Sequence, residues 1–184
     1  MSKARTVELE LIQRCSSGDS YAFDDLYDRF GDCVWRVCCR MTPSTADAED
    51  MAQEVWVRVW EQIKSFRCEC AFSTWLYRVT SNVCLQWLRK TNNHTSLPLD
   101  RDMGDESPSV ESVALGRDET AKLLNALSTL SDKLRLPLVL RVEEDLSYAE
   151  IAEVLDCSTA AVKMRIARAR SILAEVVREN DDEM

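Results

Sequence analysis

Apolar residues recur at helical spacing along almost the whole chain, and this periodicity constrains the fold more than any other feature. In the segment 46–64, residues at successive steps of four are apolar and so share one side of a helix: Met51, Val55, Val59 and Ile63. The chain has only four Gly and four Pro, whereas an all-β fold requires many turns. The sequence therefore predicts an all-α protein.

Short interruptions divide this pattern into separate helices. The polar stretch "SSGDS" and Pro43, which cannot continue a helix, bound the second expected helix, whose apolar residues include Tyr27. We expect the first four helices at about 6–16, 21–39, 46–64 and 72–90, with a short loop at 67–71.

The composition changes between residues 91 and 116. This segment holds two of the four Pro, two of the four Gly, many Ser, and five acidic residues against one Arg, which is typical of a linker. Helical periodicity then resumes and continues to about Arg178. We therefore expect two small helical domains, at 1–90 and 118–178, joined by an acidic linker at 91–117 and followed by an acidic tail at 179–184.

The segment 147–173 combines the signals of a helix, a tight turn and a second helix. Ser147 and Glu150 have the spacing of a capping box, which predicts a helix that starts at Tyr148. Asp156 lies where the chain must turn, and Asp tolerates a left-handed backbone. Ser158 then suits the N-cap of the second helix. This is the layout of a helix-turn-helix, whose second helix enters the major groove of DNA.

The second of these helices is basic, although the chain has a net charge of -9. Residues 158–172 include no acid, and four cations fall mostly off the apolar face: Lys163, Arg165, Arg168 and Arg170. Cations at such positions can meet phosphates and base edges, so we interpret this helix as a DNA-binding element. The alternative is a solvated basic face on an ordinary helical hairpin.

A second basic window, residues 65–90, mixes aromatic rings with cations. Its members are the rings of Phe66, Phe72, Trp75, Tyr77 and Trp87 and the cations Arg67, Arg78, Arg89 and Lys90. Single-stranded nucleic acid requires both, because rings stack on unpaired bases while cations hold the backbone. For any single ring, a place in the helical core is the alternative. The preceding helix is acidic instead, which indicates either a basic protein partner or simple solvation.

No motif of the sequence indicates an enzyme or a cofactor. There is no recognisable Ser/His/Asp set, P-loop or dinucleotide-binding glycine pattern, and the only His, His94, lies in the expected linker. No apolar run approaches the roughly 18 residues of a membrane span, and the N-terminus lacks the layout of a signal peptide. We therefore expect a cytoplasmic, non-enzymatic protein without a cofactor.

Two segments of the chain resemble a known family. The stretch "DAEDMAQEVWVRVWEQIKSFRCECAFSTWLYRVTSN" resembles the second conserved region of the bacterial extracytoplasmic-function (ECF) sigma factors, group four of the sigma-seventy family. The stretch "LSTLSDKLRLPLVLRVEEDLSYAEIAEVLDCSTAAVKMRIARARSIL" resembles the fourth region of the same family. The resemblance covers about 7–90 and 118–174.

The resemblance implies a transcription initiation factor that binds core RNA polymerase, recognises minus-thirty-five and minus-ten promoter elements, and nucleates DNA melting. The implied contacts with the clamp helices of the largest polymerase subunit are Asp47, Asp50, Gln53, Glu54 and Arg58. The implied minus-ten residues, on a loop and helix that capture a flipped base, are Phe66, Arg67, Trp75, Tyr77, Arg78, Ser81 and Asn82. The implied minus-thirty-five residues are Arg141, Ser158, Thr159, Lys163, Met164, Arg165 and Arg168.

The resemblance further implies a stress- or envelope-type regulon, an anti-sigma partner, and an acidic linker that threads toward the RNA exit path. The chain departs from the family pattern at Asp156, where many relatives carry Gly, and at Cys68 and Cys70 in the promoter loop. Met164 is a poor hydrogen-bonding group for a recognition helix, which leaves the promoter sequence open. Two other functions are alternatives: a stand-alone helix-turn-helix regulator and a thiol-based metal or redox sensor.

The eight cysteines are too few for a disulfide scaffold and do not form the two C-x2-4-C pairs that together bind zinc. We expect no metal site. Four of them fall in helical apolar patterns and are expected as reduced thiols in the core: Cys33, Cys38, Cys39 and Cys84.

Oxidation of Cys68 and Cys70 is expected to impair promoter opening, because both lie on the loop that is implied to reach the minus-ten element. The measurement is open-complex formation with and without oxidant, for the natural chain and for a Cys68→Ser/Cys70→Ser variant. Equal sensitivity of the two proteins, or no effect of oxidant on either, would contradict the hypothesis.

Overall fold

The computed structural model describes residues 3–94 and 123–182, and every regular element within these ranges is a helix. The expected all-α class is therefore confirmed. The N-terminal unit contains α1 (Lys3–Ser16), α2 (Ser20–Met41), α3 (Thr45–Gln62), the short 3-10 helix η1 (Ile63–Ser65) and α4 (Phe72–His94). The C-terminal unit contains a helical stretch at 123–128, α6 (Asp132–Val142), α7 (Tyr148–Val154) and α8 (Thr159–Asp182). Most of the predicted linker, at 95–117, lies outside the described residues.

Two helices of the N-terminal unit, α2 and α3, begin at residues whose side chains cap them. At the start of α2, the side chain of Asp19 accepts a hydrogen bond from the backbone N–H of Ala22, 3.2 Å away. Ser44 caps α3 in the same way, with its Oγ 3.1 Å from the N–H of Asp47. Between the two helices the backbone becomes extended at Thr42, next to the proline that was expected to end the helix.

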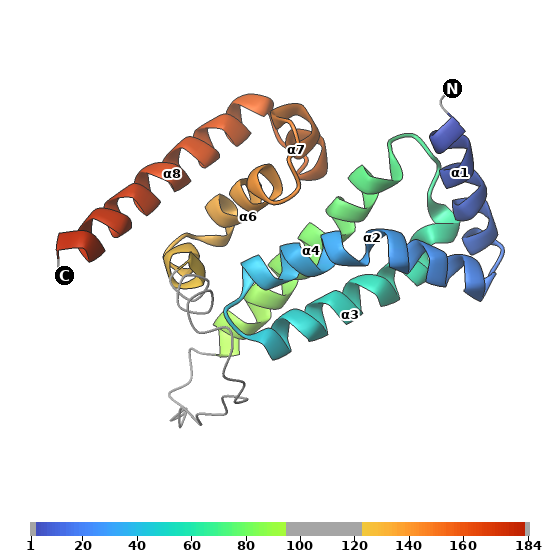
Figure 1. Ribbon diagram of the computed structural model, residues 1–184, viewed down its shortest axis with the longest axis horizontal. Helices are drawn as coiled ribbons and strands as arrows, with labels where there is room; N and C mark the ends of the chain where they lie inside the picture. Colours follow the sequence, from blue (N-terminus) through green and yellow to red (C-terminus); the bar gives the residue numbers. More distant parts are fainter. Residues whose placement is uncertain (1–2, 95–122, 183–184) are drawn as a thin grey trace.

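Helices α2, α3 and α4 pack side by side, and α1 crosses one end of this bundle (Figure 1). The four residues at steps of four on α3 and η1 are all 0% exposed: Met51, Val55, Val59 and Ile63. Leu26 and Val34 of α2 are buried against them in the same core. The helical periodicity of the sequence therefore identifies the buried side of the bundle.

Two helices run further than the sequence pattern indicated. Helix α4 continues to His94 and α8 to Asp182, whereas the apolar periodicity ends near Lys90 and Arg178. Neither extension contains Gly or Pro, so helical hydrogen bonding can continue after the periodicity has ended. Within 3–94 and 123–182, even these longest helices lack the apolar character that a membrane span needs.

The helix-turn-helix forms as the sequence predicts. Ser147 Oγ accepts a hydrogen bond from the N–H of Glu150 at 3.3 Å, and the Glu150 carboxylate accepts one from the N–H of Ser147 at 2.8 Å. Asp156 has a φ of 47° at the turn between α7 and α8, in the left-handed region. Ser158 then caps α8, with its Oγ 3.1 Å from the N–H of Ala161.

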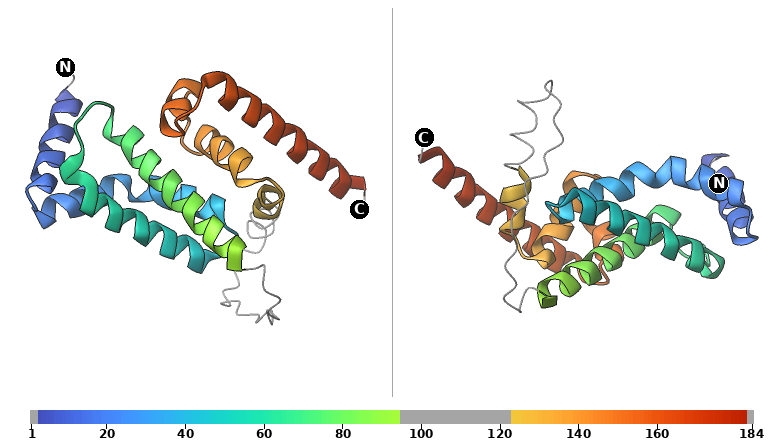
Figure 2. Two further views of the ribbon diagram at one scale, coloured as in Figure 1. Left: turned by 180° about the vertical axis from the view of Figure 1, so that it is seen from behind. Right: turned by 90° about the horizontal axis from the view of Figure 1, so that it is seen from below.

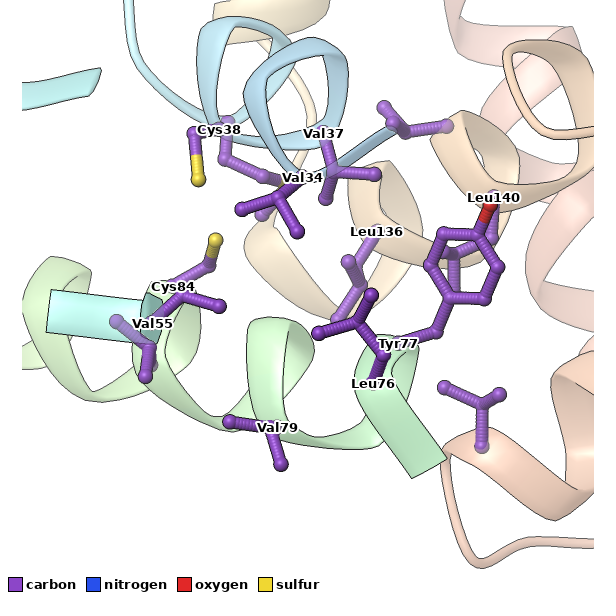
Figure 3. Close-up of a cluster of buried hydrophobic side chains, with 14 of the residues drawn as sticks. Val34, Val37, Cys38, Val55, Leu76, Tyr77, Val79, Cys84, Leu136 and Leu140 are labelled. Carbon is purple, nitrogen blue, oxygen red and sulfur yellow. The ribbon is translucent and has the colours of Figure 1, made fainter. Parts of the chain in front are cut away.

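The two units pack on each other, because α6 and α7 lie against α2 and α4 (Figures 1 and 2). Figure 3 shows side chains of α2, α4 and α6 in one apolar cluster, in which Leu76 and Tyr77 approach Leu136 and Leu140. All four of these side chains are buried. A continuous core therefore joins the two units.

Arg135 is a buried cation at this junction. Its guanidinium donates hydrogen bonds to the backbone carbonyl groups of Met41 at 2.8 Å, Leu130 at 3.1 Å and Ser128 at 3.2 Å. Burial lowers the pKa of Arg135. Because Met41 is the last residue of α2, this side chain ties the end of α2 to α6 and to the turn before it.

Replacing Arg135 with Met is expected to lower the free energy of unfolding by about 2–4 kcal/mol, because the buried carbonyl groups lose their donor. Urea unfolding followed by circular dichroism measures the change. Lys133→Met is the matched control, since Lys133 is exposed on the same helix, and its effect is expected to stay within about 0.5 kcal/mol. Equal unfolding midpoints for the two variants would contradict the structural role of Arg135.

Candidate nucleic-acid and protein interfaces

The residues expected to contact a protein partner lie along α3. Asp50 and Gln53 are exposed, and Asp47 is half-buried in the first turn. Glu54 and Arg58 form an ion pair one helical turn apart, with 2.8 Å between Oε1 and Nε. A partly exposed pair of this kind contributes little stability, so both side chains are able to change partners on binding.

A groove with aromatic walls lies beside these residues, between α2 and α3. Tyr27 and Trp35 of α2 line it together with Gln53 and Trp56 of α3. The rings of Tyr27 and Trp56 pack with their centroids 5.0 Å apart, yet Tyr27 is 51% exposed and Trp35 37% exposed. We did not predict this groove from the sequence, because we interpreted Tyr27 only as an apolar residue of the second helix. A signal was present, since Trp35 follows Tyr27 by about two helical turns and shares its face.

A cluster of three rings lies where the loop between η1 and α4 meets the start of α4. Phe66, Phe72 and Trp75 pack on one another with centroid distances of 5.3 to 5.7 Å. Phe72 is buried, whereas Phe66 and Trp75 keep part of their surface exposed. A hollow beside the cluster is lined by this loop, α1 and the start of α4, including Leu9, Ile12, Phe66, Cys68, Cys70 and Phe72.

The remaining residues expected at the minus-ten element differ in their access to solvent. Arg67 on the loop and Asn82 on α4 are exposed. Tyr77 is 6% exposed and Ser81 is 2% exposed. The structure therefore does not bring these last two side chains to a free surface.

Tyr77 and Arg78 are held by the C-terminal unit. The Tyr77 hydroxyl donates a hydrogen bond to Oε2 of Glu144 at 2.6 Å, between residues 67 positions apart. Arg78 Nη2 donates to the backbone carbonyl of Glu153 at 2.9 Å. Burial, followed by the bond to Glu144, raises the pKa of Tyr77 above its usual value. The role of Glu144 was not predicted, because no local pattern indicates a partner so distant in the sequence.

The first turns of α8 present most of the expected minus-thirty-five residues to solvent. The exposed members of this set are Ser158, Thr159, Lys163, Met164 and Arg168. Arg165 is half-buried, and its Nη1 lies 3.8 Å from Sγ of Cys157 in the turn. The structure therefore brings these residues together on one cationic surface.

The ring of Tyr148 adds Arg141 to this surface. The guanidinium carbon of Arg141 lies 5.5 Å from the ring centroid, and Nζ of Lys163 lies 5.7 Å from it. Arg141 also donates a hydrogen bond to the carbonyl of Leu146 at 2.8 Å. Cations from α6 and α8 are thus held beside the same ring.

All eight cysteines are free thiols. The sulfur atoms of Cys38 and Cys84 face each other between α2 and α4 (Figure 3). The pKa of Cys84 is raised well above its usual value, because its thiol hydrogen bonds with Cys38 and is buried. Cys33 and Cys39 pack against the core, so the expected packing of these four thiols is confirmed. Within 3–94 and 123–182, no three His, Cys, Asp or Glu side chains gather in a way that could hold a metal ion.

The two cysteines of the loop differ in their surroundings. Cys68 is exposed, and its φ of 57° places a sharp bend in the loop. Cys70 is half-buried, and burial raises the pKa of its thiol. Because the thiolate is the reactive form, the raised pKa of Cys70 disfavours its oxidation. Cys68 is the better exposed of the two to an oxidant.

Two family models match the chain. Sigma-70 region 2 matches residues 26–94, and Sigma-70, region 4 matches residues 120–173. These ranges contain the acidic helix α3, the aromatic loop and α4 in the first case, and the helix-turn-helix in the second. The class of protein that the fold and its surfaces define is therefore an RNA polymerase sigma factor.

Relatives narrow this class. The chain is 31% identical over 180 residues to the ECF RNA polymerase sigma factor SigW of Bacillus subtilis. The alignment covers 91% of this chain and 95% of SigW. It is 32% identical over 173 residues to the ECF RNA polymerase sigma-E factor of Haemophilus influenzae, with coverage of 89% and 91%. The chain belongs to the ECF sigma factors, which are not a family of enzymes, and it is a transcription initiation factor that directs RNA polymerase to promoters.

Solved structures share the fold across both units. The structure of CnrH in complex with the cytosolic domain of CnrY has a TM-score of 0.71 and 25% identity, and it covers 92% of this chain and 96% of that one. The sigma factor RpoE from Bartonella quintana, in complex with the anti-sigma factor NepR, has a TM-score of 0.68 at 22% identity, with coverage of 85% and 96%.

Replacing Lys163 with Ala is expected to weaken promoter binding by the polymerase that carries this chain. The slope of log affinity against log salt concentration should fall by about one, because one phosphate contact is lost. A salt titration of promoter binding measures both effects. Arg178→Ala removes the same charge from an exposed position near the other end of α8 and is expected to leave the slope unchanged. Equal slopes for the natural chain and both variants would show that Lys163 does not meet a phosphate.

Proposed function

We propose that this sigma factor binds the clamp helices of the largest subunit of core RNA polymerase through α3. The exposed Asp50 and Gln53 support this assignment, together with the neighbouring groove of Tyr27, Trp35 and Trp56. Acidic groups suit a basic helical partner, and exposed aromatic rings are frequent anchors of protein interfaces. Helix α3 also lies on the side of the N-terminal bundle away from α8 (Figure 2).

The first turns of α8 read the minus-thirty-five element. Lys163 and Arg168 are exposed where a helix in the major groove would meet phosphates and base edges. Met164, exposed between them, offers an apolar contact of the kind that recognises a thymine methyl group.

The loop before α4 captures an unstacked base of the minus-ten element. Support comes from the hollow beside Phe66, from the partly exposed ring of Trp75, and from the exposed cation Arg67. Unstacking costs a few kcal/mol per base step, whereas stacking on an aromatic ring returns roughly 1–3 kcal/mol per base. The free energy gained by stacking one captured base therefore does not offset the cost of melting several base steps. The contacts with polymerase and with the minus-thirty-five element contribute the rest of the stabilisation.

The partners of the chain follow from these surfaces. They are core RNA polymerase and promoter DNA, so we place the protein in the cytoplasm, where both are found. We also propose an anti-sigma partner, as the family resemblance implies. In the structure that shares 25% identity with this chain, CnrH is likewise bound to a second protein, the cytosolic domain of CnrY.

One observation carries the proposal: the chain has an acidic, aromatic surface on α3 and a separate cationic surface on α8. A stand-alone helix-turn-helix regulator would need only the second surface. The exposed ring of Trp35 and the exposed Asp50 are together what a second macromolecule that binds α3 would contact.

Changing both Asp50 and Gln53 to Ala is expected to abolish initiation that depends on this chain, because the α3 surface loses its exposed polar contacts. The measurement adds the purified protein to core polymerase and follows transcription from a promoter library. A double change of Gln86→Ala and Glu175→Ala also removes one amide and one acid, at exposed positions on α4 and α8, and should retain initiation. If the natural chain binds duplex DNA alone but gives no transcript with core polymerase, the proposal fails.

A further inference from the structure

We propose that the groove between α2 and α3 is a binding site for an arginine side chain. The identity of the protein that supplies this arginine, the polymerase subunit that contacts α3, rests on the function proposed above. Aromatic rings and carboxylates line the groove together, and this combination determines which chemical group can fill it. The surface of α3 thereby acquires one anchoring point for its partner.

Two adjoining hollows make up this groove, and both are lined by Tyr27, Trp35 and Trp56. The first hollow has a volume of about 240 Å³, which is far more than one water molecule needs. Asp28 and Asp32 line it as well. These α2 residues recur at steps of four and so share the face of α2 that lies beside α3 (Figure 1). The groove therefore has room for the head group of a side chain.

The ring of Trp56 is held in place by its neighbours. It is 7% exposed, and it packs on Tyr27 with 5.0 Å between the ring centroids and on Phe23 with 5.8 Å between them. Tyr27 and Trp35 keep more of their surface exposed to solvent. A ring that is already ordered loses little rotamer freedom when a ligand binds. The groove thus offers at least one prearranged aromatic wall.

The charged groups of the groove are acidic. Asp28 and Asp32 are exposed on α2, and the exposed Glu49 lines the second hollow from α3. The face of an aromatic ring attracts cations because its quadrupole is negative there, so rings and carboxylates favour the same sign of charge. A base stacked on these rings would bring its phosphates next to the carboxylates, which would repel them. The groove therefore favours a cation over a nucleic acid.

Among cations, the guanidinium of arginine fits this groove best. A metal ion needs a shell of several donor atoms, and no three His, Cys, Asp or Glu side chains gather in that way within the described ranges. The planar guanidinium can stack on a ring and donate paired hydrogen bonds to a carboxylate, whereas the ammonium of lysine is a strongly hydrated point charge. The lining of rings and carboxylates therefore selects arginine.

The first measurement titrates the full-length chain with N-acetylarginine amide and follows the indole N–H signals of its five Trp residues by nuclear magnetic resonance. We expect saturable shifts that are largest at Trp35 and Trp56. N-acetylcitrulline amide has nearly the same shape without the charge and should cause no saturable shift. N-acetyllysine amide should need at least about threefold higher concentrations for the same shifts.

The second measurement gives the affinity of the labelled full-length chain for core RNA polymerase by fluorescence anisotropy. An Asp28→Asn/Asp32→Asn variant keeps the shape of both side chains and removes their charge. We expect it to bind core polymerase about tenfold more weakly and to lose the shifts with the arginine derivative. The control is Asp24→Asn/Asp25→Asn, which removes the same charge from exposed positions on the same helix and should match the natural chain.

Equal shifts with the arginine and citrulline derivatives, or with the arginine and lysine derivatives, would overturn the arginine site. Arginine-dependent shifts together with an unchanged affinity of the Asp28→Asn/Asp32→Asn variant for core polymerase would overturn the polymerase as the source of the arginine. Circular dichroism confirms that the variants stay folded. Failure of the proposed function is distinguishable, since the natural chain would then give no transcript with core polymerase although the arginine derivative still shifts the Trp35 signal.

Discussion

A buried carboxylate is stable only while donors surround it, and Glu144 finds its donors on the opposite unit, at Arg36 and Tyr77. The relative position of the two units depends on this bond. The same junction includes the apolar contacts of Leu136 and Leu140 with α4 and the hydrogen bond of Arg135 to the end of α2. Buried ion pairs contribute more to the choice of one geometry than to net stability, because desolvation offsets much of their attraction. Such a contact therefore favours one particular arrangement of the two units.

The charges of the chain are segregated rather than mixed. The net charge is -9, yet the first turns of α8 are cationic and α3 is acidic. Overall charge governs solubility and long-range steering, whereas local surfaces decide which macromolecule binds. An acidic protein can therefore bind DNA through local cationic surfaces and keep the rest of its surface unattractive to nucleic acid. The aromatic groove beside α3 follows the same segregation of charge. Trp35 and Tyr27 lie next to acidic residues and not next to the cations of α8.

Local patterns predicted most of the fold, because the physics that determines them is local. The capping box of Ser147 and Glu150, the left-handed Asp156 and the cap at Ser158 each depend on residues within a few positions. The buried side of α3 follows from helical spacing in the same way. The contact of Arg36 with Glu144 joins residues 108 positions apart, and no periodicity or cap indicates such a pair. For that reason the sequence placed Tyr77 on a DNA-binding helix without indicating what covers it, and it left the groove of Tyr27 unrecognised.

The ring of Tyr148 has a consequence for the entropy of binding. Arg141 and Lys163 come from different helices, and each long side chain would lose about 2 kcal/mol of rotamer freedom if it had to be ordered by DNA. In this structure both already rest on one ring, 5.5 and 5.7 Å from its centroid, so part of that ordering is complete before DNA arrives. A phosphate that binds beside this ring would therefore meet two cations whose positions are already restricted, and less side-chain entropy would be lost on binding.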